Sequence, residues 1–272
     1  MLEIINRNSS RGKFKFALFD FDGTISLIRE GWQKVMKSYF YEEMRKTPDG
    51  KTEGEESLRN CIDEFVDINT GKQTIYQCFA LVDEMKKRGG KPEEALFYKD
   101  EYQRRLLEQI DHRIYGLEHK LIAPETLVVP GSFEFLDMLR EHGITLFLAS
   151  GTDEEFAQHE AEILGVTKYF GDHVYGAQRD YRSFSKKMVI ERILRENNLQ
   201  GEELLGVGDG FVEIENVKEA GGFALGVASD EKNRSGQPDA WKRERLTRAG
   251  ADAVIPDYSD LNELKIYLMG KE

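Results

Sequence analysis

The sequence predicts an α/β protein with a doubly wound parallel sheet and an inserted all-helical domain. From about residue 126 onward, short continuous apolar runs alternate with helical patterns, as expected for a parallel sheet covered by helices on both faces. Residues 27–125 hold helical patterns and almost no strand pattern. We therefore expect an α/β core formed by residues 1–26 and 126–272, and a helical domain at residues 27–125.

The first predicted strand is the apolar run KFALFD at residues 15–20, which ends in an aspartate. Its continuous apolar character is typical of a strand buried on both faces. Five later runs have the same character: ITLFLAS (144–150), HVYGA (173–177), LLGVGDG (204–210), GFALGVAS (222–229) and ADAVIPD (251–257).

Helices are predicted between these strands at residues 132–143, 154–165 and 185–198, and the first two end on a glycine. The insertion holds four more helical patterns, at 29–46, 55–71, 73–90 and 92–110. A helical domain inserted after the first strand is expected over the carboxyl ends of the strands. Open α/β sheets bind their ligands there.

The composition describes a soluble globular chain of 272 residues with a formal net charge of −12. This charge argues against nucleic acid or an anionic membrane as the main partner. Cys61 and Cys78 match neither a disulfide framework nor a zinc pattern, which favours the reducing cytoplasm. No apolar run is long enough for a signal peptide or a membrane span, so a cytoplasmic protein is expected.

The segment DFDGT begins with two carboxylates, Asp20 and Asp22, at the end of the first strand. Carboxylates this close repel each other unless a cation lies between them, and they suit Mg²⁺. Gly23 permits a tight turn, and Thr24 offers a hydroxyl and an N–H group to an anion. The alternative is an ordinary strand-to-turn exit without a ligand.

A second acidic site follows the strand at 204–208, where Asp209 lies between two glycines and Glu213 comes four residues later. A dinucleotide fingerprint would need glycine at position 211, which is Phe211 here. Asp209 is therefore predicted to share a metal with the Asp20 side. Glu213 either orients the waters of that metal or is a solvated helix residue.

Two further segments carry groups suited to an anion. Ser150 ends a predicted strand and Gly151 follows it, leading into a helix N-terminus, where N–H groups and a hydroxyl bind phosphate or simply cap the helix. Lys186 opens a predicted helix, where a lysine is not favoured by the helix dipole unless an anion is near. The adjacent Lys187 is the competing choice, and periodicity alone does not decide between them.

Taken together, these segments resemble the haloacid dehalogenase superfamily of phosphotransferases. Its four motifs read here as DFDGT, ASG, Lys186 and GDGFVEIE. The resemblance covers roughly residues 12–26 and 126–260. The helical insertion is similar to the cap of the subclass that includes phosphoglycolate phosphatases and β-phosphoglucomutases. The fourth motif often has aspartate where this chain has Glu213.

The resemblance implies a role for each motif residue. Asp20 would be the nucleophile and Asp22 the general acid and base. Mg²⁺ would be held by Asp20, the Asp22 carbonyl and Asp209. Ser150, Lys186 and the N–H groups near Gly23, Thr24 and Gly151 would hold the phosphoryl oxygens.

The function expected on this basis is a Mg²⁺-dependent phosphatase of a small soluble phosphomonoester, a sugar phosphate or a phosphoglycolate-like compound. An intramolecular phosphomutase shares every motif residue, and a non-enzymatic phospho-accepting signalling domain is a third possibility. The sequence identifies neither the substrate nor the oligomeric state. In the predicted cap, the turn NTGKQTIYQ makes Lys72 and Gln73 candidate specificity residues that contact the leaving group.

Overall fold

The computed structural model describes residues 1–270 and divides into two compact units. Among the described residues, the first unit contains 1–30 and 114–270, and the second contains 31–113. The insertion predicted from the sequence, residues 27–125, is wider on both sides than the second unit. The later boundary of this unit lies inside one long helix, α4 (Ala95–Glu118), whose pattern does not change where the units separate.

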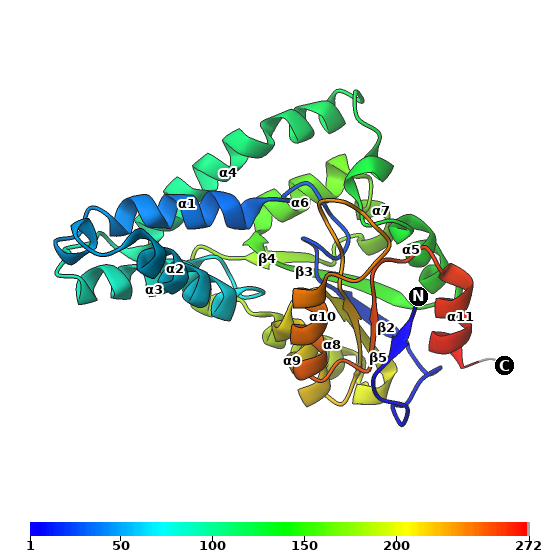
Figure 1. Ribbon diagram of the computed structural model, residues 1–272. Coiled ribbons are helices and arrows are strands. Elements are labelled where there is room, and N and C mark those ends of the chain that lie inside the picture. The colour runs from blue at the N-terminus through cyan, green and yellow to red at the C-terminus, as the bar shows by residue number, and fades with distance from the viewer. Residues whose placement is uncertain (271–272) are drawn as a thin grey trace. The chain divides into compact units, whose positions relative to one another are not determined.

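The first unit is built on a seven-stranded sheet with the order β1-β7-β6-β5-β2-β3-β4 (Figure 1). The strands are β1 (Glu3–Ile4), β2 (Phe16–Phe19), β3 (Thr145–Asp153), β4 (Val174–Ala177), β5 (Leu204–Gly208), β6 (Phe223–Val227) and β7 (Ala253–Ile255). Strand β1 pairs antiparallel with β7, and the other neighbouring strands pair in parallel. The predicted doubly wound parallel sheet is thus confirmed, with one short antiparallel edge strand added.

Helices connect the strands of this sheet and cover both of its faces (Figure 1). They are α5 (Ser132–Glu141), α6 (Glu154–Ile163), α7 (Thr167–Phe170), α8 (Lys186–Asn197), α9 (Phe211–Glu219), α10 (Ala240–Arg248) and α11 (Leu261–Met269). Strand β2 shows how both faces are filled, because successive side chains point to opposite sides. Leu18 belongs to the core with α8 and α9, whereas the Phe19 ring lies 6.1 Å from Phe135 of α5.

The second unit is helical, as predicted for the insertion. Its helices are α1 (Trp32–Met44), α2 (Glu55–Asn69), α3 (Ile75–Lys87) and most of α4. Apolar residues line its interior, and the rings of Phe40 and Phe65 stack with centroids 5.8 Å apart. Cys61 and Cys78 both lie in this unit as free thiols. None of the described helices is long and apolar enough to cross a bilayer.

Candidate active site

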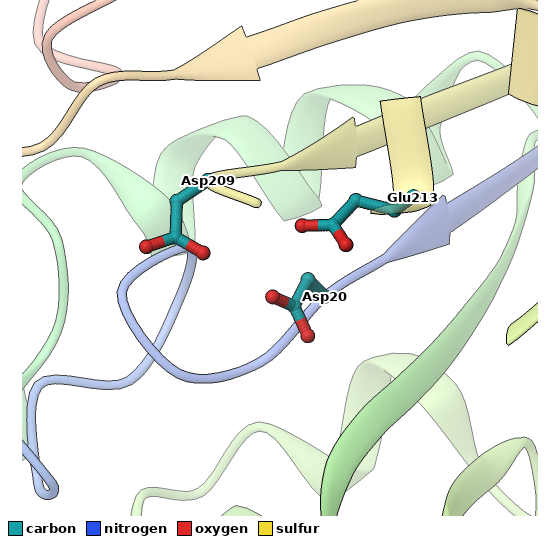
Figure 2. Close-up of side chains that lie close together, drawn as sticks. All are labelled: Asp20, Asp209 and Glu213. Atoms are coloured by element: carbon teal, nitrogen blue, oxygen red, sulfur yellow. The ribbon is translucent and has the colours of Figure 1, made fainter. Parts of the chain in front are cut away.

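Three carboxylates from separate elements converge at the carboxyl ends of the central strands. Asp20 directly follows β2, Asp209 directly follows β5, and Glu213 lies in the first turn of α9 (Figure 2). One oxygen from each carboxylate lies within 4.8 Å of the others. The parallel pairing of β2 with β5 brings the two strand ends to one edge of the sheet. Because like charges at this separation repel, the group needs counter-charges.

Lys186 supplies one of these counter-charges. Its Nζ lies 2.7 Å from Oδ1 of Asp20 and donates to Oε2 of Glu213 at 3.0 Å. Burial by itself would lower the pKa of Lys186, but the carboxylates of Asp20 and Glu213 outweigh this effect and raise the pKa. The ammonium group therefore stays charged while it bridges the two acids.

The neighbouring Lys187 points elsewhere. It is exposed, and its Nζ lies 2.6 Å from Oε2 of Glu219. The helix start is fixed by the hydroxyl of Ser185, which accepts the N–H of Met188 at 3.1 Å. With that start, the helical period places Lys186 on the buried face with Val189 and Ile190. The structure thus brings Lys186, and not Lys187, to the carboxylates.

Glu213 also caps the N-terminus of its own helix, α9. Its Oε1 accepts the backbone N–H of Gly210 at 2.6 Å, which is the usual capping contact of a glutamate at the third helical position. The side chain therefore folds back across the end of β5. A Cβ atom at Gly208 would lie 2.3 Å from the Cγ of Glu213, so the glycine leaves room for this side chain. Glu213 is buried against Lys186, which excludes the alternative of a solvated helix residue.

Two hydroxyl groups of β3 hold the carboxyl of Asp22. Thr152 donates from Oγ1 to Oδ2 at 2.9 Å, and Ser150 donates from Oγ to the same oxygen at 3.3 Å. The Nε of Arg29 lies 4.0 Å from the other oxygen, Oδ1, which is buried and has no hydrogen-bond partner within residues 1–270. Burial raises the pKa of Asp22 to about 6, against the opposing effect of Arg29.

Ser150 and Gly151 lie within an irregular strand end. The strand predicted from the sequence ends at residue 150, whereas β3 continues to Asp153 and shifts its register against β4 after Ala149. In this segment the Oγ of Ser150 also accepts the N–H of Thr152 at 3.0 Å. The expected contact of Ser150 and Gly151 with phosphate stays a prediction.

The turn after β2 is fixed against Asp209. Gly23 has φ +75°, and a Cβ atom there would lie 2.3 Å from Oδ2 of Asp209. Its N–H donates to the carbonyl of Ser26 at 2.9 Å, and the N–H of Thr24 donates to the carbonyl of Phe21 at 3.3 Å. The Oγ1 of Thr24 accepts the N–H of Asp209 at 2.9 Å. The Thr24 hydroxyl thus joins the turn to the end of β5, whereas the N–H groups of Gly23 and Thr24 bond within the turn, and the expected role of these groups toward phosphate stays a prediction.

A second lysine, which was not among the predicted site residues, reaches the site from α10. The Nζ of Lys242 lies 2.7 Å from Oδ2 of Asp209 and 2.6 Å from Oε1 of Glu231. It also donates to Oγ of Ser229 at 3.0 Å. Ser229 in turn donates to the carbonyl of Gly23 at 2.6 Å, so this group is tied to the turn that carries Asp20 and Asp22.

The candidate specificity residues lie in the helical unit, in the turn between α2 and α3. The Nζ of Lys72 donates to Oδ1 of Asn69 at 3.0 Å, and Gln73 is buried. Their expected contact with a leaving group stays a prediction.

The model of one protein family matches residues 14–221, and its description is haloacid dehalogenase-like hydrolase. The chain belongs to this family. The matched range contains every motif residue that carried the resemblance, from Asp20 to Glu213. The expectation of a hydrolase of the haloacid dehalogenase family is thereby confirmed.

Several solved structures have a similar fold. A predicted phosphoglycolate phosphatase from Haemophilus somnus has a TM-score of 0.57 at 16% identity, over 93% of this chain and 98% of that one. A predicted phosphatase from Clostridium acetobutylicum has a TM-score of 0.59 at 19% identity, over 94% and 99%. A β-phosphoglucomutase from Clostridium difficile has a TM-score of 0.59 at 15% identity, over 93% and 97%.

One curated relative matches a shorter segment. It is the copper-exporting P-type ATPase B of Enterococcus hirae, which is 29% identical over 111 residues, 40% of this chain. The match spans 13% of the length of that ATPase.

The donor set of this haloacid dehalogenase-like site fits a hard divalent cation. Asp20, Asp209 and Glu213 offer carboxylate oxygens within 4.8 Å of one another, which is the ligand chemistry that Mg²⁺ prefers. Glycine at position 23 lets the turn approach Asp209 closely, because a Cβ atom there would lie 2.3 Å from Oδ2 of Asp209. The residues present can therefore hold such an ion.

Several residues that complete this site were missed from the sequence. Thr152 had a usable signal, because residues two apart on a strand point to the same face and Ser150 was already a candidate. Lys242 and Glu231 had none. Glu231 lies in the segment between β6 and α10 and Lys242 lies in α10 itself, and neither position follows a motif spacing.

Proposed function

We propose that this protein is a Mg²⁺-dependent phosphatase that hydrolyses a small soluble phosphomonoester through an aspartyl phosphate on Asp20. The observation that carries the proposal is the position of Lys186, whose buried ammonium bridges Asp20 and Glu213 beside Asp209. One site then holds three groups: Asp20 as the carboxylate nucleophile, the ammonium of Lys186, and Asp209 as an acid that binds the metal. A sugar phosphate or a phosphoglycolate-like compound is the proposed class of substrate.

In the first step, a carboxylate oxygen of Asp20 attacks phosphorus. A bond forms between this oxygen and phosphorus as the bond to the ester oxygen breaks, and the carboxyl of Asp22 gives its proton to the departing oxygen. In the second step, water attacks the phosphorus of the aspartyl phosphate. Its proton passes to Asp22, inorganic phosphate leaves, and the Asp20 carboxylate is regenerated.

The surroundings of Asp22 support its role as the proton carrier. Thr152 and Ser150 fix one carboxyl oxygen, Oδ2, and the other, Oδ1, has no hydrogen-bond partner among residues 1–270. Burial raises the pKa of Asp22 to about 6, so both protonation states are accessible near neutral pH.

The phosphoryl group would be held by donors that stay available in the site. An ammonium has three N–H bonds, and Lys186 directs two of them at Asp20 and Glu213, which leaves one for a phosphoryl oxygen. Mg²⁺, when held by Asp20, Asp209 and the main-chain carbonyl of Asp22, would reduce the repulsion between a carboxylate nucleophile and a phosphate dianion.

The proposal is tested with purified protein on a panel of phosphomonoesters, with Mg²⁺ and after chelation. We expect release of inorganic phosphate that stops in chelator and returns with Mg²⁺, and one phosphoryl group on the peptide that contains Asp20 after acid quenching. Conversion of a sugar phosphate to its isomer without phosphate release would identify a phosphomutase instead. Slow labelling of Asp20 without turnover of any ester would identify a phospho-accepting domain.

A further inference from the structure

Lys242 has a place in this site that the reaction steps above do not use. We propose that Lys242 is an internal counter-ion of the metal site, which holds Asp209 and Glu231 together in metal-free protein and limits the charge that attracts a cation. This inference rests on the proposed function, because it concerns the same cation. It adds a residue that competes with the cation electrostatically and takes no part in the chemistry on phosphorus.

The contacts of Lys242 account for its whole donor capacity. The ammonium has three N–H bonds, and Asp209, Glu231 and Ser229 lie at 2.7, 2.6 and 3.0 Å from its nitrogen. Lys186 has two such partners and keeps one N–H bond for a substrate. Lys242 is therefore saturated by the protein itself, and its role is toward the carboxylates.

The two lysines divide the acidic residues into two similar ion-pair triads. In one triad Lys186 lies between Asp20 and Glu213, and in the other Lys242 lies between Asp209 and Glu231. Each triad has one positive and two negative charges, so each has a net charge of −1. The two together have a net charge of −2, which equals in magnitude the charge of one divalent cation.

The balance of charge around Lys242 affects the stability of the metal-free protein because these groups are shielded from solvent. Lys242 and Glu231 are largely removed from solvent, and the carboxylates of Asp209 and Glu231 outweigh the effect of burial and raise the pKa of Lys242. A buried carboxylate that loses its partner is costly, because few water molecules replace the lost interaction. Without Lys242, Asp209 and Glu231 would face each other and Asp20 with only Lys186 to offset them.

The neighbouring charges do not replace Lys242. Arg29 is the nearest other cation on the Asp22 side, and its Nη2 lies 2.7 Å from Oε1 of the buried Glu160. Its Nε is 4.0 Å from Asp22. The single positive charge of Arg29 is thus shared by two carboxylates, Glu160 and Asp22, and none of it is left for Asp209, which pairs with Lys242.

The test measures Mn²⁺ binding and metal-free stability without any substrate. For Lys242→Met, we expect the melting temperature in chelator to fall by several degrees and the Mn²⁺ dissociation constant, from titration calorimetry, to fall about tenfold or more. For Lys242→Met/Glu231→Gln, the charge returns to the original value, and we expect the dissociation constant to return to within about threefold of the unsubstituted protein.

Glu231→Gln alone keeps Lys242 on Asp209 and removes one negative charge. We expect it to weaken Mn²⁺ binding by about tenfold, and this variant decides the question if Lys242→Met does not fold in chelator. The control is Lys218→Met. Lys218 also forms an ion pair with a buried carboxylate, that of Asp252 at 2.8 Å, and it belongs to neither ion-pair triad. It is expected to lower the melting temperature and leave Mn²⁺ affinity unchanged.

Weaker or unchanged Mn²⁺ binding in Lys242→Met would overturn the proposal, and so would a double variant that binds as Lys242→Met does. An unchanged affinity in Glu231→Gln would also overturn it. These results leave the proposed phosphatase untouched, because it depends on Mn²⁺ or Mg²⁺ binding to the unsubstituted protein. Absence of binding there would reject the metal in both proposals.

Discussion

The ammonium of Lys186 lies 2.7 Å from Oδ1 of Asp20, and the same ammonium donates to Glu213 at 3.0 Å. The positive charge of Lys186, at the N-terminus of α8, thus lies between the proposed nucleophile, Asp20, and Glu213, which caps the N-terminus of α9. This arrangement holds the nucleophile in one orientation before substrate arrives.

Lys186→Ala is expected to reduce kcat/KM on an aryl phosphate by an amount equivalent to about 2–4 kcal/mol of transition-state stabilisation. Lys187→Ala removes a lysine of the same helix whose partner is the exposed Glu219, and its kcat/KM should stay unchanged. Steady-state kinetics at saturating Mg²⁺ measures both. Equal losses in the two variants would contradict the assignment of Lys186.

Asp20→Asn is expected to abolish turnover without unfolding the protein. The amide keeps the shape of the carboxylate, lacks its nucleophilicity, and removes one negative charge from the acidic group. The melting temperature in chelator should therefore be equal or higher, as measured by circular dichroism. Retention of a tenth of the activity would exclude Asp20 as the nucleophile. Asp260→Asn, at an exposed carboxylate beside the N-terminus, is the matched control.

The loss of kcat caused by Asp22→Asn is expected to depend on the leaving group, because an alkoxide needs a proton more than a nitrophenolate does. We expect kcat to fall by about 10²–10⁴-fold on an alkyl phosphate, and by clearly less on p-nitrophenyl phosphate. Thr152→Val, which keeps the acid and removes the 2.9 Å hydrogen bond to it, should give a smaller loss. Equal losses of Asp22→Asn on both esters would argue against proton transfer by this residue.

Gly23→Ala combines backbone strain with a collision. A residue with a Cβ atom at φ +75° costs about 1–2 kcal/mol, and this Cβ would lie 2.3 Å from Asp209. Gly143→Ala introduces the same strain at φ +74° with no atom within 4 Å, so it is the control. We expect both variants to lose thermal stability and only Gly23→Ala to lose Mg²⁺-dependent activity. Loss of activity in both would show that strain alone is responsible.

Much of the fold was predictable because a parallel sheet needs continuous apolar strands. The run KFALFD and the five later runs correspond to β2–β7, and the order of strands and helices confirmed the predicted class. Strand β1 was not predicted. It has two residues, one of them exposed, and it exists through its pairing with β7 rather than through its own sequence pattern.

The candidate site was predictable where the functional groups follow strands directly. Asp20 and Asp209 are of this kind, since the sheet itself brings the ends of β2 and β5 together. The choice between Lys186 and Lys187 was not, because a shift of one residue in the helix start exchanges them, and only the cap at Ser185 fixes that start. Lys242 depends on the path of a long connection, which no local pattern encodes.

The Glu213 side chain lies across the end of β5, and this position restricts which residues related proteins can carry at position 208. The side chain occupies the space that any Cβ atom at position 208 would need, at 2.3 Å from its Cγ. A relative with aspartate at position 213 still has a Cγ atom in this place, and it loses only the reach to the N–H of Gly210. Glycine is therefore expected at position 208 with either acid at position 213, whereas the contact that caps α9 is expected only with glutamate.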